Sequence, residues 1–171
     1  RFFNAKAQRR EGKDAKGEVA GWFCCCGLEL GRMVWVSGGA GMLEPSEAAN
    51  AAARAVVDAA LAVHRALGPG LLESVYEHCL AHELQERGLD VQRQVTMPVA
   101  YRGTHLDAGF RVDLVVGDCV LVEIKAVERL LPVHEAQVLT YLKLSGREIG
   151  LLVNFNVVLL KQGIRRLIRV S

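Results

Sequence analysis

Three charged residues in two neighbouring apolar segments have the types and spacing that metal chemistry requires. Asp113 stands in the first segment, and Glu123 and Lys125 stand two residues apart in the second. A pair of carboxylates supplies the hard oxygen ligands that Mg²⁺ and Mn²⁺ prefer. The lysine would alternatively neutralise both acids and leave a structural cluster of salt bridges on a sheet. The residue types alone therefore keep two interpretations open, a divalent metal site and an ion cluster.

The alternation of apolar and polar residues predicts that the two segments are strands of a β-hairpin. Side chains along a strand point alternately to the two faces of a sheet, so the apolar set should share one face. That set is even-numbered: Val112, Leu114, Val116, Val120, Val122 and Ile124. A two-residue turn would put Asp113 opposite Val122, whereas a three-residue loop, Gly117–Cys119, puts it opposite Glu123. We therefore predict that loop or an equivalent bulge.

Two carboxylates in this register would lie about 4.5–5.5 Å apart at their Cβ atoms, with Lys125 on the same face. Like charges directly opposite destabilise a sheet, so a compensating positive charge is needed. Val115 and Leu121 stand beside the charges and indicate a partly covered cleft rather than open solvent. This context favours a bound divalent cation over the lysine alone.

Two expected helices add further polar groups. Glu73 falls at the edge of the apolar arc of a helix over about 71–87. It would either join the acidic cluster or simply favour the positive end of the helix dipole. Gln137 and Tyr141 are four residues apart on a helix over about 133–144 and therefore share a face. That pair fits a site, but it also fits an ordinary contact at the edge of a core.

The elements that must position these residues follow in the order helix, helix, three strands, helix and two strands. Ser46 is the expected N-cap of the first helix, and Gly88 is the expected end of the second. Helices are predicted over 46–67, 71–87 and 133–144, and strands over 91–101, 110–116, 120–125, 149–154 and 164–170. Such an order predicts an α/β fold, an α/β/α sandwich around one mixed central sheet.

The chain has 171 residues, of which 51% are hydrophobic and 23% charged, as in one ordinary globular domain. Aromatic residues make up only 6%, which argues against a single-strand binder built on stacked rings. The formal net charge is +2, and residues 44–171 carry fourteen basic and fifteen acidic side chains. No global basic field therefore exists, and a polyanion would have to be bound locally.

The first 43 residues differ in composition from the rest and lack a helical or strand period. We expect residues 1–43 to be a disordered or non-native tail and residues 44–171 to be the domain. Glu29 and Arg32 interrupt the longest apolar stretch, so no membrane span is expected. The five cysteines, at 24–26, 79 and 119, lack the spacing of a metal or disulfide framework. Free thiols of this kind are typical of a reducing cytoplasm.

Taken in chain order, Asp113, then Glu123-Ile124-Lys125, then Gln137 with Tyr141 resembles the PD-(D/E)XK nuclease superfamily. An upstream segment also matches the G-x-x-E-x-x-Y signature of the GxxExxY protein family within that superfamily. The signature residues are Gly70, Glu73 and Tyr76. The resemblance covers about residues 56–170 and includes the segments 132–137 and 154–156. One departure is that Val112, and not proline, precedes the aspartate. The resemblance implies a restriction-endonuclease-like fold with a PD-(D/E)XK core.

The resemblance also implies an activity, the metal-dependent hydrolysis of DNA phosphodiester bonds with Mg²⁺ or Mn²⁺ as cofactor. Asp113, Glu123 and the carbonyl of Ile124 would be metal ligands, with Glu73 completing the acidic cluster directly or through a water. Lys125 would orient or activate the attacking water and stabilise charge on phosphorus. The helix pair, Gln137 and Tyr141, would position the water and a phosphate.

Basic residues near the C-terminus would hold the nucleic-acid backbone in this interpretation. They are Lys161, Arg165, Arg166 and Arg169, and Arg54, Arg65 and Arg111 are further candidates. Phosphate contacts of this kind are salt-dependent and independent of sequence. Because the domain is nearly neutral, a homodimer or another partner would supply more basic surface.

Two other functions stay open at this level. The first is a catalytically inactive nuclease-fold module that binds nucleic acid or a protein partner. The second is an unrelated α/β domain in which the charges form only salt bridges. The complete set of polar residues favours catalysis, and the requirement for metal separates a nuclease from a binding module.

Overall fold

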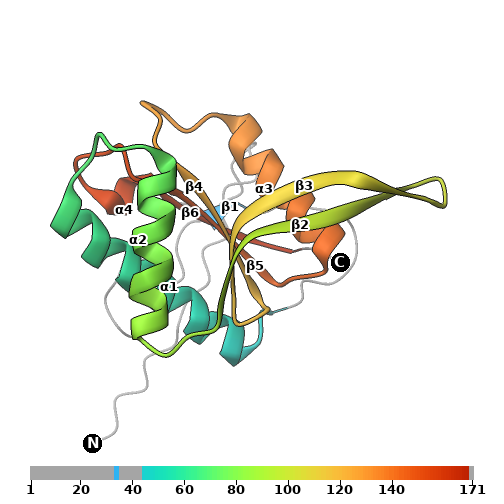
Figure 1. Ribbon diagram of the computed structural model, residues 1–171, viewed down its shortest axis with the longest axis horizontal. Helices are drawn as coiled ribbons and strands as arrows, with labels where there is room; N and C mark the ends of the chain where they lie inside the picture. The colour runs from blue at the N-terminus through green and yellow to red at the C-terminus, as the bar shows by residue number, and fades with distance from the viewer. Residues whose placement is uncertain (1–32, 35–43, 170–171) are drawn as a thin grey trace, which may run out of the picture.

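The computed structural model describes residues 33–34 and 44–169. Its centre is a mixed six-stranded sheet in the order β1-β6-β5-β4-β3-β2 (Figure 1). The strands are β1 (Met33–Val34), β2 (Val91–Tyr101), β3 (Thr104–Val116), β4 (Val120–Lys125), β5 (Ile149–Asn154) and β6 (Ile164–Ile168). The pairs β1–β6 and β4–β5 are parallel, and the other three pairs are antiparallel.

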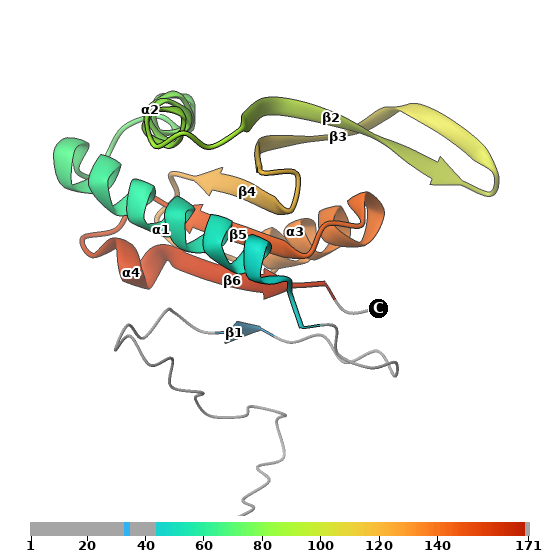
Figure 2. The ribbon, with the colours of Figure 1, turned by 90° about the horizontal axis from the view of Figure 1, so that it is seen from below.

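Helices cover both faces of the sheet (Figure 2). They are α1 (Glu47–Leu67), α2 (Glu73–Glu86), α3 (Pro132–Ser145) and the short α4 (Leu160–Gly163). One hydrophobic core lies between the sheet and α1 with α2, and a second lies between the sheet and α3. The α/β/α sandwich predicted from the sequence is therefore confirmed. No helix in the described part of the chain is long and apolar enough to cross a bilayer.

The start of α1 is fixed by a capping residue with two sets of bonds. The Ser46 hydroxyl oxygen accepts a hydrogen bond from the Ala49 N–H at 3.2 Å, as expected of an N-cap. The Ser46 N–H and hydroxyl in turn donate to the two carboxylate oxygens of Glu148, at 2.5 and 2.9 Å. Because Glu148 directly precedes β5, the cap also ties α1 to the sheet.

Close packing of α3 on the sheet depends on a glycine in β5. A Cβ atom at Gly150 would lie 2.4 Å from Cγ1 of Val138 and 3.2 Å from Cδ1 of Leu142, both on α3. Only glycine therefore permits this approach without movement of these side chains or of the helix. The close approach brings the polar face of α3 to the strand that carries Glu123.

The β3–β4 hairpin has the predicted three-residue loop. Its register pairs Val116 with Val120 and Leu114 with Val122. Within the loop, Gly117 and Asp118 adopt positive φ angles of 57° and 54°. The parity argument from the sequence is confirmed at this end of the hairpin.

The expectation of one continuous apolar face along β3 is wrong at Val112. Leu114 packs in the core beneath α1 and α2, but Val112 packs in the core beneath α3. The reason is an interruption of the β2–β3 ladder, in which Arg93 pairs with Leu114 and Val95 with Val112 while Gln94, at φ 52°, and Asp113 are not paired. The side-chain alternation therefore shifts by one face at Asp113.

Beyond this interruption, β2 and β3 continue as a long two-stranded arm that projects from the sheet (Figures 1 and 2). The strand β3 is longer than predicted because the sequence pattern marked only its inner half. Of the segment 1–43, expected to be a tail, only β1 lies within the described residues. Neither β1 nor α4 was predicted, because two and four residues are too few for a periodic pattern.

Candidate active site

Four of the predicted site residues form one hydrogen-bonded cluster between β4 and α3. The Lys125 ammonium donates to Glu123 Oε1 at 2.6 Å. The same oxygen accepts from Gln137 Nε2 at 3.0 Å, and this amide also donates to the Tyr141 hydroxyl oxygen at 2.5 Å. The Glu123 side chain is only 5% exposed. Of the i, i+4 pair on α3, Gln137 therefore contacts the strand carboxylate and Tyr141 contacts Gln137.

The Asp113 carboxylate lies beside this cluster, where the strand ladders open. The β3–β4 pairing extends to Leu114 and Val122. One residue further, Asp113 Oδ2 accepts a hydrogen bond from the backbone N–H of Ile124 at 2.8 Å. A backbone donor of β4 is thus satisfied by a side chain of β3, and the carboxylate is held next to the Glu123–Lys125 segment.

The chain that leaves β4 is held from two sides. Glu73, the first residue of α2, accepts a hydrogen bond from the Ala126 N–H at 2.9 Å. Asn154, at the end of β5 and buried, donates to the Val127 carbonyl at 2.8 Å and accepts from the Val127 N–H at 3.1 Å. Glu73 is therefore brought to the site, with one oxygen already occupied by the backbone.

The residues of the G-x-x-E-x-x-Y signature build the turn that places Glu73. The Tyr76 hydroxyl donates to the Gly68 carbonyl at 2.6 Å and accepts from the Leu71 N–H at 3.1 Å. Its ring stacks on Phe155 with centroids 4.4 Å apart. Gly70 adopts a φ of 100°, a conformation that favours glycine. The signature thus fixes the approach of α2 to the sheet.

Burial and crowding of charge set the electrostatics of the site. Burial raises the pKa of Asp113, although the hydrogen bond from Ile124 and the charge of Lys125 oppose this. Burial likewise raises the pKa of Glu123, against the hydrogen bond from Lys125 and with the help of the Asp113 charge. Burial would lower the pKa of Lys125, but the bond to Glu123 and the surrounding carboxylates outweigh it and raise that pKa. The two acids therefore share one lysine, and its charge does not fully offset the effect of burial on their pKa values.

Comparison with known proteins agrees with this geometry. Residues 50–167 match the family model described as the PD-(D/E)XK nuclease superfamily. The chain belongs to that superfamily. Nucleases of the PD-(D/E)XK superfamily generally use divalent metal ions. No curated protein and no solved structure matches the chain at a significant level.

The donor atoms of this PD-(D/E)XK site fit a divalent ion bound by few protein ligands. Within the described residues, no group of three or more histidine, cysteine, aspartate or glutamate side chains is arranged to hold a metal. A smaller donor set is present, because Glu123 Oε2 is buried and has no hydrogen-bond partner among those residues. Such an oxygen needs a cation or a water. Together with the adjacent Asp113 carboxylate it suits Mg²⁺, which keeps several waters and uses one or two carboxylates.

The basic residues predicted to hold a phosphate backbone are not gathered on one face of this domain. Arg165 lies near Glu135 of α3, with Nε 3.7 Å from the carboxylate oxygen. Its neighbour Arg166 contacts Asn50 of α1 on the opposite face of the sheet. Lys161 is exposed and Arg169 is partly exposed. Adjacent positions of a strand point to opposite faces, so β6 divides this basic segment.

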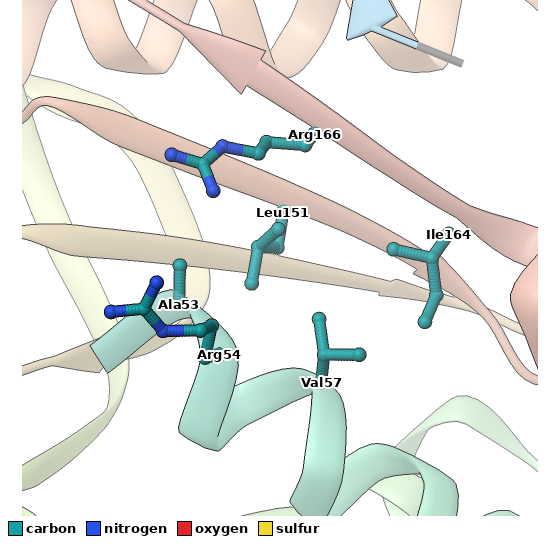
Figure 3. Close-up of a pocket in the computed structure, with 6 residues that line it drawn as sticks. All are labelled: Ala53, Arg54, Val57, Leu151, Ile164 and Arg166. Carbon is teal, nitrogen blue, oxygen red and sulfur yellow. The ribbon is translucent and has the colours of Figure 1, made fainter. Parts of the chain in front are cut away.

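Two of the basic candidates meet on the α1 side of the sheet (Figure 3). Arg54 and Arg166 line a pocket of about 10 Å³, which is closed by apolar residues. These are Ala53, Val57, Leu151 and Ile164. Burial, followed by the charge of Arg54, lowers the pKa of Arg166. The pocket has room for about one water and not for a phosphate group. Arg65 and Arg111 are exposed.

Two polar residues near the site were missed from the sequence. Gln94 of β2 donates through Nε2 to Asp113 Oδ1 at 3.4 Å and to Glu77 Oε2 at 2.5 Å. Glu77 is buried on α2. A signal was available, since Glu73 and Glu77 stand at i and i+4, where like charges repel unless a partner separates them.

Proposed function

We propose that this protein is a metal-dependent nuclease that hydrolyses phosphodiester bonds of DNA, with Mg²⁺ or Mn²⁺ as cofactor. The observation that carries the proposal is Glu123 Oε2, which is buried and has no hydrogen-bond partner among the described residues, on a carboxylate that also binds Lys125. Most buried side-chain oxygens are hydrogen-bonded, and one without a partner calls for a bound ion or a water. Membership in the PD-(D/E)XK superfamily supports nucleic acid as the substrate class.

The metal ligands in this proposal are the carboxylates of Asp113 and Glu123 and the backbone carbonyl of Ile124. A bound divalent ion lowers the pKa of its water and polarises the phosphoryl oxygen. Glu73 acts at the edge of this set, through a water, because its Oε1 already accepts the Ala126 N–H. Its second oxygen remains available for that contact.

Lys125 stabilises the negative charge that develops on the phosphoryl group, and it orients the attacking water. Its ammonium is mostly buried, so the interaction with a phosphate is weakly screened. In the metal-free arrangement the same ammonium reduces repulsion between the two acids. Gln137 and Tyr141 position the water and the phosphate, since both present hydrogen-bonding groups beside Glu123.

Finer assignments complete the proposal. The Tyr76 anchor and Gly70 turn support membership in the GxxExxY family within the superfamily. Lys161 and Arg169 contribute phosphate contacts, with Arg165 and Arg166 acting from opposite faces of β6. A homodimer would join such separated charges into a longer basic surface. Free Cys79 and Cys119 support a reducing compartment such as the cytoplasm.

The deciding experiment is cleavage of supercoiled plasmid and linear DNA with Mg²⁺, Mn²⁺ or EDTA. We expect cleavage by the wild type with either metal and none with EDTA. Lys125→Ala should remain folded but lose at least about 100-fold in rate, as when one charge-stabilising donor is removed. Lys143→Ala is the matched control, because Lys143 is an exposed lysine in the last turn of α3. DNA binding in EDTA without cleavage in Mn²⁺ would identify a binding module instead.

A further inference from the structure

An unusual backbone conformation lies directly opposite the Asp113 carboxylate. Gln94 adopts a φ of 52° in the middle of β2, flanked by regular ladder pairs on both sides. The left-handed conformation costs an L-residue other than glycine roughly 1–2 kcal/mol. Glutamine is not among the residues that adopt it readily. Surrounding contacts must therefore hold this residue in place.

Those contacts come from α2. Gln94 Nε2 donates to Glu77 Oε2 at 2.5 Å. The other carboxylate oxygen, Glu77 Oε1, accepts from Arg93 Nε at 2.9 Å. Glu77 is 6% exposed and is paired with Arg93 in an ion pair. Hydrogen bonds to a buried charged group are stronger than neutral ones. The Gln94 amide is consequently fixed by a buried carboxylate that belongs to a different element.

The fixed amide faces the site. Its Nε2 is 3.4 Å from Asp113 Oδ1, while Asp113 Oδ2 accepts the Ile124 N–H. Each oxygen of the Asp113 carboxylate thus accepts one hydrogen bond. Asp113 itself lies at a gap in the strand ladder, so strand pairing does not restrain it. Loss of the amide would leave Oδ1 without this donor, and the carboxylate would then be held by the Ile124 N–H alone.

The same irregularity in β2 and β3 also directs residues of the two-stranded arm toward Tyr141 on α3. Because the alternation shifts at Gln94 and Asp113, Met97 and Phe110 turn toward α3. Phe110 stacks on the Tyr141 ring with centroids 4.0 Å apart. Without the shift, regular alternation would direct these arm residues to the other face of the sheet.

We propose that Gln94 is a positioning residue that holds the Asp113 carboxylate toward β4, and that buried Glu77 anchors it. This proposal rests on the proposed function of Asp113 as a metal ligand. Gln94 does not touch the metal or the substrate, and it acts through Asp113.

The test uses Gln94→Gly, because glycine relieves the positive φ and removes the side chain that carries the amide. Asp118→Gly is the matched control, since Asp118 also has a positive φ, 54°, but lies in the hairpin loop. Two quantities are measured on the full chain. One is the exchange rate of the Ile124 amide proton by NMR without metal, and the other is the affinity for Mn²⁺ by titration calorimetry. Thermal unfolding verifies that both variants fold.

We expect Gln94→Gly to speed Ile124 amide exchange by about two- to tenfold, the equivalent of one ordinary hydrogen bond. Its Mn²⁺ affinity should fall about 10–100-fold, as for other residues that orient a ligand. Glu77→Gln should change both in the same direction by smaller factors, and Asp118→Gly should change neither. Unchanged Ile124 exchange together with wild-type Mn²⁺ affinity in a folded Gln94→Gly protein would overturn the positioning role.

The two readouts also separate this proposal from the proposed function. If the wild type binds no Mn²⁺ and Ile124 exchange still rises in Gln94→Gly, the positioning role holds and the metal assignment fails. If the wild type binds Mn²⁺ but Gln94→Gly has no effect on exchange or affinity, the metal assignment holds and the positioning role fails.

Discussion

Replacement of Glu123 by glutamine should make the metal-free protein more stable and remove its response to metal. Glutamine has the shape of the protonated carboxyl group. The pKa of Glu123 is raised in the fold, even with the favourable contribution of Lys125 included. At neutral pH the ionised form therefore destabilises the native state relative to the neutral form. Glu123→Gln should accordingly raise the free energy of unfolding.

The hydrogen bonds of the site permit this replacement. Glu123 Oε1 accepts from Lys125 and Gln137, and an amide oxygen in its place would accept the same two bonds. Oε2 has no partner within the described part of the chain, so an NH₂ group there breaks none of the observed bonds. The direction of the pKa shift sets the direction of this effect, so the metal-free Tm should rise. For a domain of this size each 1 kcal/mol of added stability corresponds to roughly 3–5 °C in Tm.

Bound Mn²⁺ should make the wild type more stable than Glu123→Gln, the reverse of the order expected in EDTA. At a free Mn²⁺ concentration of 100 times Kd, binding to the native state alone adds about 2.7 kcal/mol. The wild-type Tm should then rise by roughly 8–13 °C, following the same proportion. Glu123→Gln replaces an anionic ligand by a neutral one and should gain only a small part of that shift.

Thermal unfolding followed by circular dichroism, in EDTA and in Mn²⁺, measures both effects. Glu128→Gln is the control, because Glu128 is an exposed acid in the loop after β4 and its change of charge is the same. That variant should follow the wild type in both buffers. The reasoning is refuted if Glu123→Gln lowers the metal-free Tm by several degrees, or if Mn²⁺ raises its Tm as much as that of the wild type.

Three further outcomes follow from the same structure. Because the pKa values of Asp113 and Glu123 are both raised, their contribution to metal-free stability is largest below the unfolded-state pKa and declines as pH rises through the folded-state pKa. Unfolding measured from about pH 4 to 8 should show this slope weakened in a variant with both residues amidated. Gly150→Ala should cost about 1–3 kcal/mol in chemical denaturation, and Val138→Ala in the same chain should recover part of it, because the new Cβ would meet Val138. Tyr76→Phe should cost about 1–3 kcal/mol by the same measurement, since the ring still stacks but the two hydrogen bonds to the partly exposed α1–α2 turn are lost, each contributing about 0.5–1.5 kcal/mol. No loss would mean that the hydroxyl is not needed for the turn.

Much of this architecture could be predicted because local pattern and tertiary environment agree. The strands β2, β4 and β5 begin and end where the alternating or continuous apolar runs do. The loop of the β3–β4 hairpin followed from parity, since a shift of one residue would move every side chain to the wrong face. Ser46 was identifiable because an N-cap acts within three residues.

The shift of one face at Val112 originates in an interaction across a long sequence distance. The shifted face at Val112 depends on a positive φ at Gln94, and glutamine gives no local signal of that conformation. The anchor for it is Glu77, on another element. The division of Arg165 from Arg166 is different, because strand alternation alone already separates neighbouring residues. The alternation along β6 therefore predicts that these two side chains point to opposite faces.

The irregularity at Asp113 explains how the sheet carries two acids on neighbouring strands without strong repulsion between directly opposite carboxylates. In an unbroken ladder, Asp113 and Glu123 would face each other across neighbouring strands and repel at close range. In this protein the ladder opens one residue earlier, Asp113 turns to accept the Ile124 N–H, and Glu123 is bound by Lys125 and Gln137 instead. Local departures from regular structure concentrate where function opposes stability. The opening therefore avoids direct opposition of the two acids while both still interact with Lys125.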